Sequence, residues 1–209
     1  MTEAQEAAAR FAARFPLLFH VTDPEALPGI RRNGLLSAAA LVALYEVPPE
    51  NRPALLDQNR GRGNFTRLRR EGLPGATLRD QWMPDAPLIQ TLHGTYANDP
   101  TAWRRHINAH VFFWLNRPQA ERLARVNRAR AQTVLAFDTA RLLAAHAGHA
   151  FTTPINTGIA TGLYGRPGSP RDETTFQPLA AFPRPDRRAP KELAIRDGIP
   201  DAATYLVQP

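Results

Sequence analysis

The sequence contains no cysteine among its 209 residues, and Lys191 is its only lysine. The absence of cysteine excludes disulfide bonds, a thiol nucleophile and any cysteine-based metal site. No apolar run approaches the roughly 20 residues that a membrane-spanning helix needs. Residues 1–14 also lack the charged and then apolar pattern of a secretory signal. These absences predict a cytoplasmic protein that has neither a metal nor a membrane as a partner.

Several common catalytic motifs are missing as well. The chain has no Gly-x-Ser-x-Gly elbow, no Walker phosphate loop and no kinase signature, which argues against the commonest hydrolases and phosphotransferases. His106 and His110 stand four residues apart, a spacing at which two histidines on one helix can hold a metal. However, His110 begins the apolar run 111–115, which is typical of a strand. We therefore predict no metal site.

Positive charge is the main feature of the composition. The net charge is +7, and all but one of the 26 Lys and Arg residues are arginines. Polyanions such as nucleic acids are natural partners for such a chain. Its length and its hydrophobic fraction of 43% fit a single globular domain over residues 1–209.

The stretch 17–36 carries the clearest local pattern. A short apolar run, 17–22, predicts a strand, and Pro28 and Gly34 suit the first turn and the end of a helix. His20 and Thr22 would point the same way from that strand because side chains alternate with period two. Two interpretations remain open for His20: a core histidine bonded to a nearby carbonyl, or a ligand contact.

Helices and strands alternate irregularly along the rest of the chain, without the regular cadence of a parallel sheet, which indicates an α+β fold. Caps and apolar periodicity predict helices at 3–14, 38–46, 53–56, 88–93, 103–108, 118–128 and 139–143, and Asp99 with Pro100 opens the helix at 103–108. Strands are predicted at 76–82, 111–115, 132–137, 175–179, 191–195 and 204–207.

Two further features allow both an ordinary and a functional interpretation. The arginine- and glycine-rich stretch 59–75 is either a solvated loop or a phosphate-contacting loop in which Phe65 stacks on a base. Glu192 lies at the start of an apolar strand, where an acid is either a solvated edge charge or a placed catalytic group.

The two ends of the chain resemble a known family. Residues 19–36, beginning Phe-His-Val-Thr, resemble the first strand and helix of ADP-ribosyltransferases, most closely the DarT type that modifies DNA bases. Residues 192–207, beginning Glu-Leu-Ala-Ile, are similar to the glutamate strand and the following hairpin of that fold. The middle, at 79–81, 111–114 and 154–156, resembles an uncharacterised bacterial family. The resemblance implies an α+β fold with a split mixed or antiparallel sheet and surrounding helices.

The resemblance also implies NAD as the substrate and Glu192 as the catalytic acid residue, which would bond the ribose 2′-hydroxyl and stabilise the charge that develops as the nicotinamide leaves. Arg79 would be the arginine that the DarT type uses in its middle region, and Glu173 is a second candidate acid. No tyrosine or serine of the family motifs matches the run 111–115. The residues expected to contact NAD are His20, Thr22, Gln81, Phe113, Trp114 and Asn156.

The leading hypothesis is thus a cytoplasmic NAD-dependent mono-ADP-ribosyltransferase, a glycosyltransferase of toxin or defence type that acts on a nucleic acid or nucleotide. An antitoxin protein would be a further partner. The alternative is a non-catalytic nucleic-acid-binding module, in which the stretch 59–75 grips phosphates and the NAD cleft is degenerate. A third hypothesis is an interaction protein whose basic surface meets an acidic antitoxin-like partner.

Overall fold

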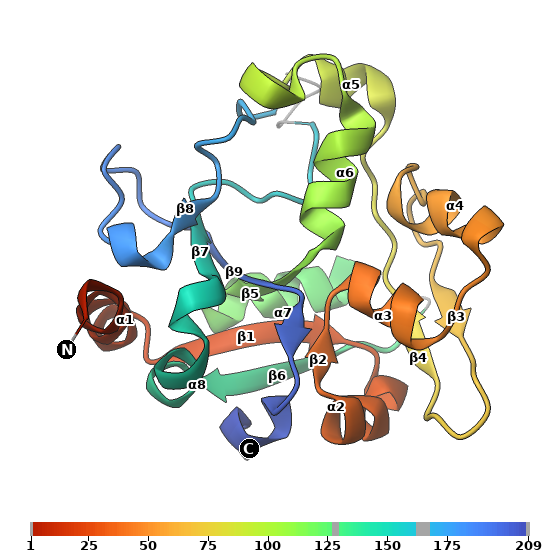
Figure 1. Ribbon diagram of the computed structural model, residues 1–209, viewed down its shortest axis with the longest axis horizontal. Coiled ribbons are helices and arrows are strands. Elements are labelled where there is room, and N and C mark those ends of the chain that lie inside the picture. The colour runs from red at the N-terminus through yellow and green to blue at the C-terminus, as the bar shows by residue number, and fades with distance from the viewer. Residues whose placement is uncertain (1, 127–129, 162–167, 208–209) are drawn as a thin grey trace.

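A computed structural model describes residues 2–126, 130–161 and 168–207 of the chain. At its centre lies an antiparallel six-stranded sheet with helices on both faces (Figure 1). Within the described residues the strand order is β6-β1-β5-β9-β7-β8. The strands are β1 Leu17–Thr22, β5 His110–Trp114, β6 Thr133–Asp138, β7 Ala150–Thr153, β8 Gln177–Pro178 and β9 Glu192–Arg196. The predicted α+β class is therefore confirmed.

The alternation of side chains along β5 divides the core between the two faces of the sheet. Val111, Phe113 and Leu115 join the larger cluster, which α1, α2 and α8 cover. Phe112 and Trp114 point to the opposite face, where α6 and α7 pack. The bounds of these helices are α1 Glu3–Arg14, α2 Leu27–Asn33, α6 Pro100–Asn108, α7 Arg117–Val126 and α8 Thr139–His146.

Most helices begin where their caps predict. The Asp99 carboxylate accepts the backbone N–H of Ala102 at 2.8 Å at the start of α6. The Asn116 side chain accepts a backbone N–H at 3.0 Å at the start of α7, and the predicted end of that helix at Arg128 lies outside the described residues. Gly34 ends α2 with φ 85°, and a Cβ there would lie 2.4 Å from the carbonyl oxygen of Ile199.

A smaller layer lies beside the main sheet and closes one side of the molecule (Figure 1). It contains α3 Ala38–Leu44, α4 Arg52–Leu56 and the hairpin of β3 Thr66–Leu68 with β4 Ala76–Leu78, packed around Val42, Tyr45 and Leu68. The prediction of a plain loop over 59–75 is wrong, because β3 lies within it. Three further short elements are α5 Asp85–Ile89 and the paired strands β2 Leu35–Leu36 and β10 Gly198–Ile199.

The predicted strand at 204–207 is also wrong. Residues Ala202–Tyr205 form a 3-10 turn, in which the Tyr205 hydroxyl donates to the Asp201 carboxylate. Val207 then makes a backbone hydrogen bond of 2.9 Å to Ala136. The apolar side chains that indicated a strand are instead used to pack the turn against α2 and α8.

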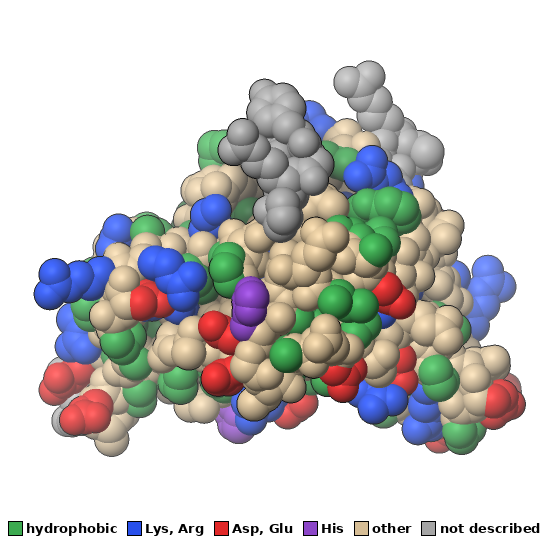
Figure 2. Space-filling view, turned by 90° about the horizontal axis from the view of Figure 1, so that it is seen from above, with side chains coloured by type: hydrophobic (Ala, Val, Ile, Leu, Met, Phe, Trp, Pro, Cys, Tyr) green, Lys and Arg blue, Asp and Glu red, His purple; other side chains and the backbone are tan. Residues whose placement is uncertain are grey.

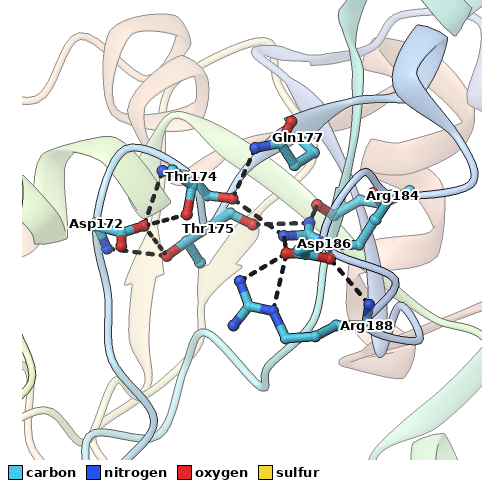
Figure 3. Close-up of polar contacts among 8 residues, drawn as sticks. Asp172, Thr174, Thr175, Gln177, Arg184, Asp186 and Arg188 are labelled. Atoms are coloured by element: carbon cyan, nitrogen blue, oxygen red, sulfur yellow. Dashed lines mark hydrogen bonds and ion pairs between the residues drawn. The ribbon is translucent and has the colours of Figure 1, made fainter.

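A buried arginine fixes the segment that precedes β9. Arg184 is 3% exposed and donates to the carbonyl of Thr152 in β7 at 2.7 Å and to the Asp186 carboxylate at 2.8 Å (Figure 3). Arg188 bonds the same carboxylate at 2.9 Å. The hydrogen bond from Arg184 holds the pKa of Asp186 well below its usual range. This network ties the segment to β7 and so helps to position the adjacent strand β9.

Candidate active site

A cleft of about 540 Å³ lies where β1, β5 and β9 meet the segments that follow β4 and β7. Its volume falls in the range of small-molecule binding sites. Nearly all residues that the sequence singled out line it, although they are scattered over the chain. Those residues are His20, Thr22, Arg79, Gln81, Trp114, Asn156 and Glu192.

The cleft forms where the central sheet opens. β1 and β5 are paired only at Phe19 and Trp114, and Trp114 pairs on its other side with Glu192 of β9. Beyond that point the ring of His20 bonds the carbonyl of Phe112 at 2.9 Å. Alternation would direct His20 and Glu192 to opposite faces. Both nevertheless line one cleft, because the cleft takes residues from both faces at the opening, including Ile30 on one and Leu123 on the other.

His20 fits both interpretations that the sequence left open, because it bonds a nearby carbonyl and also lines the cleft. A carbonyl only accepts hydrogen bonds, so Nδ1 of His20 carries the proton in its bond to Phe112, and Nε2 is an acceptor. Burial and, to a smaller extent, the positive charge of Arg79 lower the pKa of His20 to about 4, against the opposite effect of the Phe112 carbonyl. His20 is therefore a neutral, oriented imidazole at pH 7 that lines the cleft.

Glu192 is not a solvated edge charge, because it is only 4% exposed. Its Oε2 accepts three hydrogen bonds: from the Thr157 hydroxyl at 2.9 Å, from the Thr157 backbone N–H at 3.1 Å and from the Thr153 hydroxyl at 3.2 Å. The third is a shared bond, because the one proton of Thr153 also points to the Ile155 carbonyl at 3.0 Å. Burial raises the pKa of Glu192 to about 7, although these hydrogen bonds and the charge of Arg171 act in the opposite direction. A carboxyl group poised near neutrality in a cleft is typical of functional sites.

Arg171 supports the segment that holds Glu192. It is 1% exposed and donates to the carbonyls of Ser169 at 2.7 Å and Ile159, two residues beyond Thr157. Burial lowers the pKa of Arg171 to about 10, so it remains charged at neutral pH. No carboxylate of the described residues forms an ion pair with it, and its positive charge is felt by Glu192.

Arg79 lies at the same opening as His20. Its guanidinium donates to the Gln132 side chain at 2.7 Å and pairs with Asp80 at 3.2 Å. It also lies 5.8 Å from the ring centroid of Phe65, whose other contact is the guanidinium of Arg130 at 5.2 Å. Phe65 thus lies beside two arginines and lines the cleft, and the base stacking that the sequence suggested stays a prediction.

Gln81 lines the cleft and has a buried, unpaired acceptor. The amide of Asn108 donates to the Leu56 carbonyl at 2.7 Å, and its oxygen accepts from Arg60 at 3.2 Å, so its orientation is fixed. Gln81 must therefore donate to Asn108 Oδ1, at 3.1 Å. Its own Oε1 is buried and has no partner among the described residues. A buried acceptor left unpaired is costly, and a ligand that donates a hydrogen bond would satisfy it.

Two predicted residues lie elsewhere. Phe113 faces the core, 0% exposed, and packs against His20 and Phe137 with ring centroids 5.8 and 5.3 Å away. It cannot contact a ligand together with Trp114, because neighbours on a strand face opposite ways. Glu173 is exposed, accepts a hydrogen bond from the Thr95 backbone at 3.3 Å and does not line the cleft.

The arginine-rich stretch lines a second hollow, of about 460 Å³, with Arg67, Arg69 and Arg70. Arg67 is paired with Glu25 at 3.0 Å and Arg70 with Glu46 at 2.6 Å. A phosphate would have to displace these carboxylates. Figure 2 likewise shows Lys and Arg side chains interspersed with Asp and Glu on the face that it displays. Acidic side chains therefore interrupt the positive charge of this surface, and the cleft is the better candidate site.

Sequence reasoning missed the residues that influence the protonation of Glu192. Thr153 lies in β7, a strand that was not predicted, and Thr157 and Arg171 lie in Gly- and Pro-rich segments without helical or strand periodicity. The Thr-Thr-Pro-Ile-Asn-Thr run at 152–157 was the available signal, since hydroxyl and amide side chains cluster there.

No group of three or more His, Asp or Glu side chains in the described ranges is arranged to hold a metal ion. His106 and His110 do lie close, with ring centroids 4.9 Å apart, although His106 is in α6 and His110 begins β5. None of the helices in the described part of the chain is long and apolar enough to cross a membrane.

Comparison with known families places residues 16–206 in a family of unknown function (DUF7002), and the chain belongs to that family. No curated protein and no solved structure matches the chain. Family membership therefore carries no activity with it, and a function must be argued from the cleft.

Proposed function

We propose that the protein is an NAD-dependent mono-ADP-ribosyltransferase that modifies a nucleic acid or nucleotide, with the cleft as the NAD site. The observation that carries the proposal is the placement of Glu192: a buried carboxyl group, held by three hydrogen bonds, in the same cleft as His20 and Arg79. The family resemblance of the two chain ends pairs the same histidine and glutamate.

Glu192 has the chemistry that departure of nicotinamide needs. The bond between C1′ of the ribose and the pyridinium nitrogen breaks, and its electron pair leaves with neutral nicotinamide. Positive charge develops on the ribose, and an ionised carboxylate stabilises it most effectively in a site with little water. The acceptor atom supplies the electron pair for the new bond to C1′ and releases a proton. The hydrogen bonds that Glu192 receives from the described residues all reach Oε2, which leaves Oε1 for the ribose.

The other side chains of the cleft fit roles in binding. His20 is neutral and offers Nε2 as an acceptor for a ribose hydroxyl or an amide N–H. Trp114, the register partner of Glu192, offers a half-buried indole for packing against the nicotinamide ring. Thr22 and Asn156 add polar groups to the lining.

Thermal unfolding with and without NAD tests the proposal at the level of binding. NAD at about 100 times its dissociation constant should stabilise the protein by roughly 2.7 kcal/mol. Glu173→Gln, a change of an exposed acid outside the cleft, should keep this response. An unchanged unfolding temperature at millimolar NAD would contradict the proposal and favour a non-catalytic binding module.

A further inference from the structure

The guanidinium of Arg79 is held on one side and open on the other. Its Nε pairs with the Asp80 carboxylate at 3.2 Å, and its Nη1 donates to Oε1 of Gln132 at 2.7 Å. The two N–H groups of Nη2 have no hydrogen-bond partner among the described residues, and Nη2 is not one of the buried polar atoms that lack a partner. Because Arg79 lines the cleft, Nη2 is the part of the guanidinium that a ligand can reach.

Gln132 approaches Arg79 from the central sheet. It directly precedes β6, whose first residue pairs with the last residue of β1, and it also lines the cleft. The chain just before it is fixed as well, since Nε of Arg130 donates to the Asp23 carboxylate at 2.9 Å. Arg79 follows β4 of the smaller layer. The hydrogen bond between Gln132 and Arg79 therefore joins that layer to the edge of the central sheet across the cleft.

A glutamine suits this position because it accepts a hydrogen bond without adding charge. Arg79 already has one carboxylate partner, Asp80, and a second acid would cancel its remaining positive field. That field reaches His20, because the positive charge of Arg79 contributes to the lowered pKa of the imidazole. Gln132 thus fixes the direction of the guanidinium and leaves its charge effective in the cleft.

We propose that Gln132 is a positioning residue, which holds the guanidinium of Arg79 beside His20 with Nη2 turned to the substrate. The consequence for the reaction rests on the proposed transferase function, whereas the orientation itself does not. A misplacement of about 1 Å in a group that contacts the substrate can cost about 100-fold in rate. Without Gln132 the guanidinium would keep only its pairing with Asp80 and could turn away from the imidazole.

NMR titration of the His20 ring tests the orientation without any substrate. Arg79→Met removes a positive charge and should raise the pKa of His20 above its wild-type value of about 4. Gln132→Leu frees the guanidinium and should raise the same pKa by part of that amount. In a protein that already carries Arg79→Met, Gln132→Leu should add nothing, since it acts through the arginine. Gln119→Leu, the same change at an exposed glutamine outside the cleft, should leave the pKa of His20 unchanged.

Nicotinamide release measures the consequence for the reaction. Gln132→Leu should lower kcat by roughly tenfold, the effect of one hydrogen bond to a charged group. In the Arg79→Met background the same substitution should change kcat little, whereas a change that only loosens the fold would lower kcat in both backgrounds. Gln119→Leu should keep the wild-type rate.

An unchanged pKa of His20 in Gln132→Leu, or equal effects of that substitution with and without Arg79, would overturn the inference. The titration also separates the two proposals, because it needs no NAD. A shift that disappears in the double variant, in a protein that releases no nicotinamide, supports the orientation by Gln132 and contradicts the transferase. Nicotinamide release without a shift of the His20 pKa contradicts the inference alone.

Discussion

Replacing Glu192 by glutamine should stabilise the protein at alkaline pH while it removes activity. Burial raises the pKa of Glu192 to about 7 in the folded protein, from 4.5 for an ordinary glutamic acid side chain. The folded state thus holds the proton more tightly than the unfolded state does. The contribution of this proton to the free energy of unfolding is fully present below pH 4.5 and is lost as the pH rises through 7. Glutamine is neutral throughout and escapes this loss.

The size of the effect follows from the same pKa difference. At 1.36 kcal/mol per pH unit, it amounts to about 3 kcal/mol between pH 4.5 and pH 8. The two proteins share all their other titrating groups, so the difference between their free energies of unfolding isolates the carboxyl. We expect that difference, Glu192→Gln minus wild type, to grow by about 3 kcal/mol over this range.

Urea unfolding, followed by tryptophan fluorescence at pH 5 and pH 8, measures the two differences by linear extrapolation. Glu173→Gln is the matched control, because it makes the same change at an exposed acid outside the cleft. A constant difference for Glu192→Gln would refute the claim that a buried carboxyl of raised pKa lies in the cleft.

Three further results are expected. Thr157→Val removes the hydroxyl that donates to Glu192 at 2.9 Å. The pKa of Glu192, measured by infrared titration of the carboxyl group, should then rise by about one to two pH units. A fall in this pKa would contradict the donor role of Thr157. Phe113→Ala should cost about 3–5 kcal/mol of unfolding free energy without specific loss of NAD binding, whereas Trp114→Ala should lose the NAD thermal shift at a smaller cost in stability. Burial lowers the pKa of His106 to about 4. The contribution of neutral His106 to the free energy of unfolding should therefore be lost as the pH falls from 6.5 towards 4. His106→Phe should make the free energy of unfolding, measured in denaturant titrations, fall less steeply over this pH range.

Local signals in the sequence predicted the elements that carry their own caps and periodicity. The strand Leu17–Thr22 and the helix that ends at Gly34 are defined by neighbouring residues, so they could be predicted from a short window. The strands β3 and β7 could not, because they have only 3 and 4 residues. β3 exists through a short hairpin with β4, and β7 exists through its pairing with the distant strand β9. The failed strand at 204–207 shows the converse: its first residues belong to a turn, and Leu206 and Val207 make an isolated contact with β6 in place of a ladder.

The candidate site was only partly predictable for a related reason. His20 and Glu192 could be singled out because a polar residue in an apolar strand is unusual. The state of Glu192 depends on Thr157 and Arg171, whose approach to it requires the folded chain. Phe113 and Trp114 could not be told apart without the register, since alternation shows only that they face opposite sides.

Nicotinamide release is the measurement that tests the central claim most directly. The wild-type protein should release nicotinamide from NAD when a nucleic acid or nucleotide acceptor is present, with a rate that rises through about pH 7 as Glu192 ionises. Glu192→Gln should bind NAD and remain folded but lose this release, while Glu173→Gln should keep it. Equal release by wild type and Glu192→Gln would contradict the account.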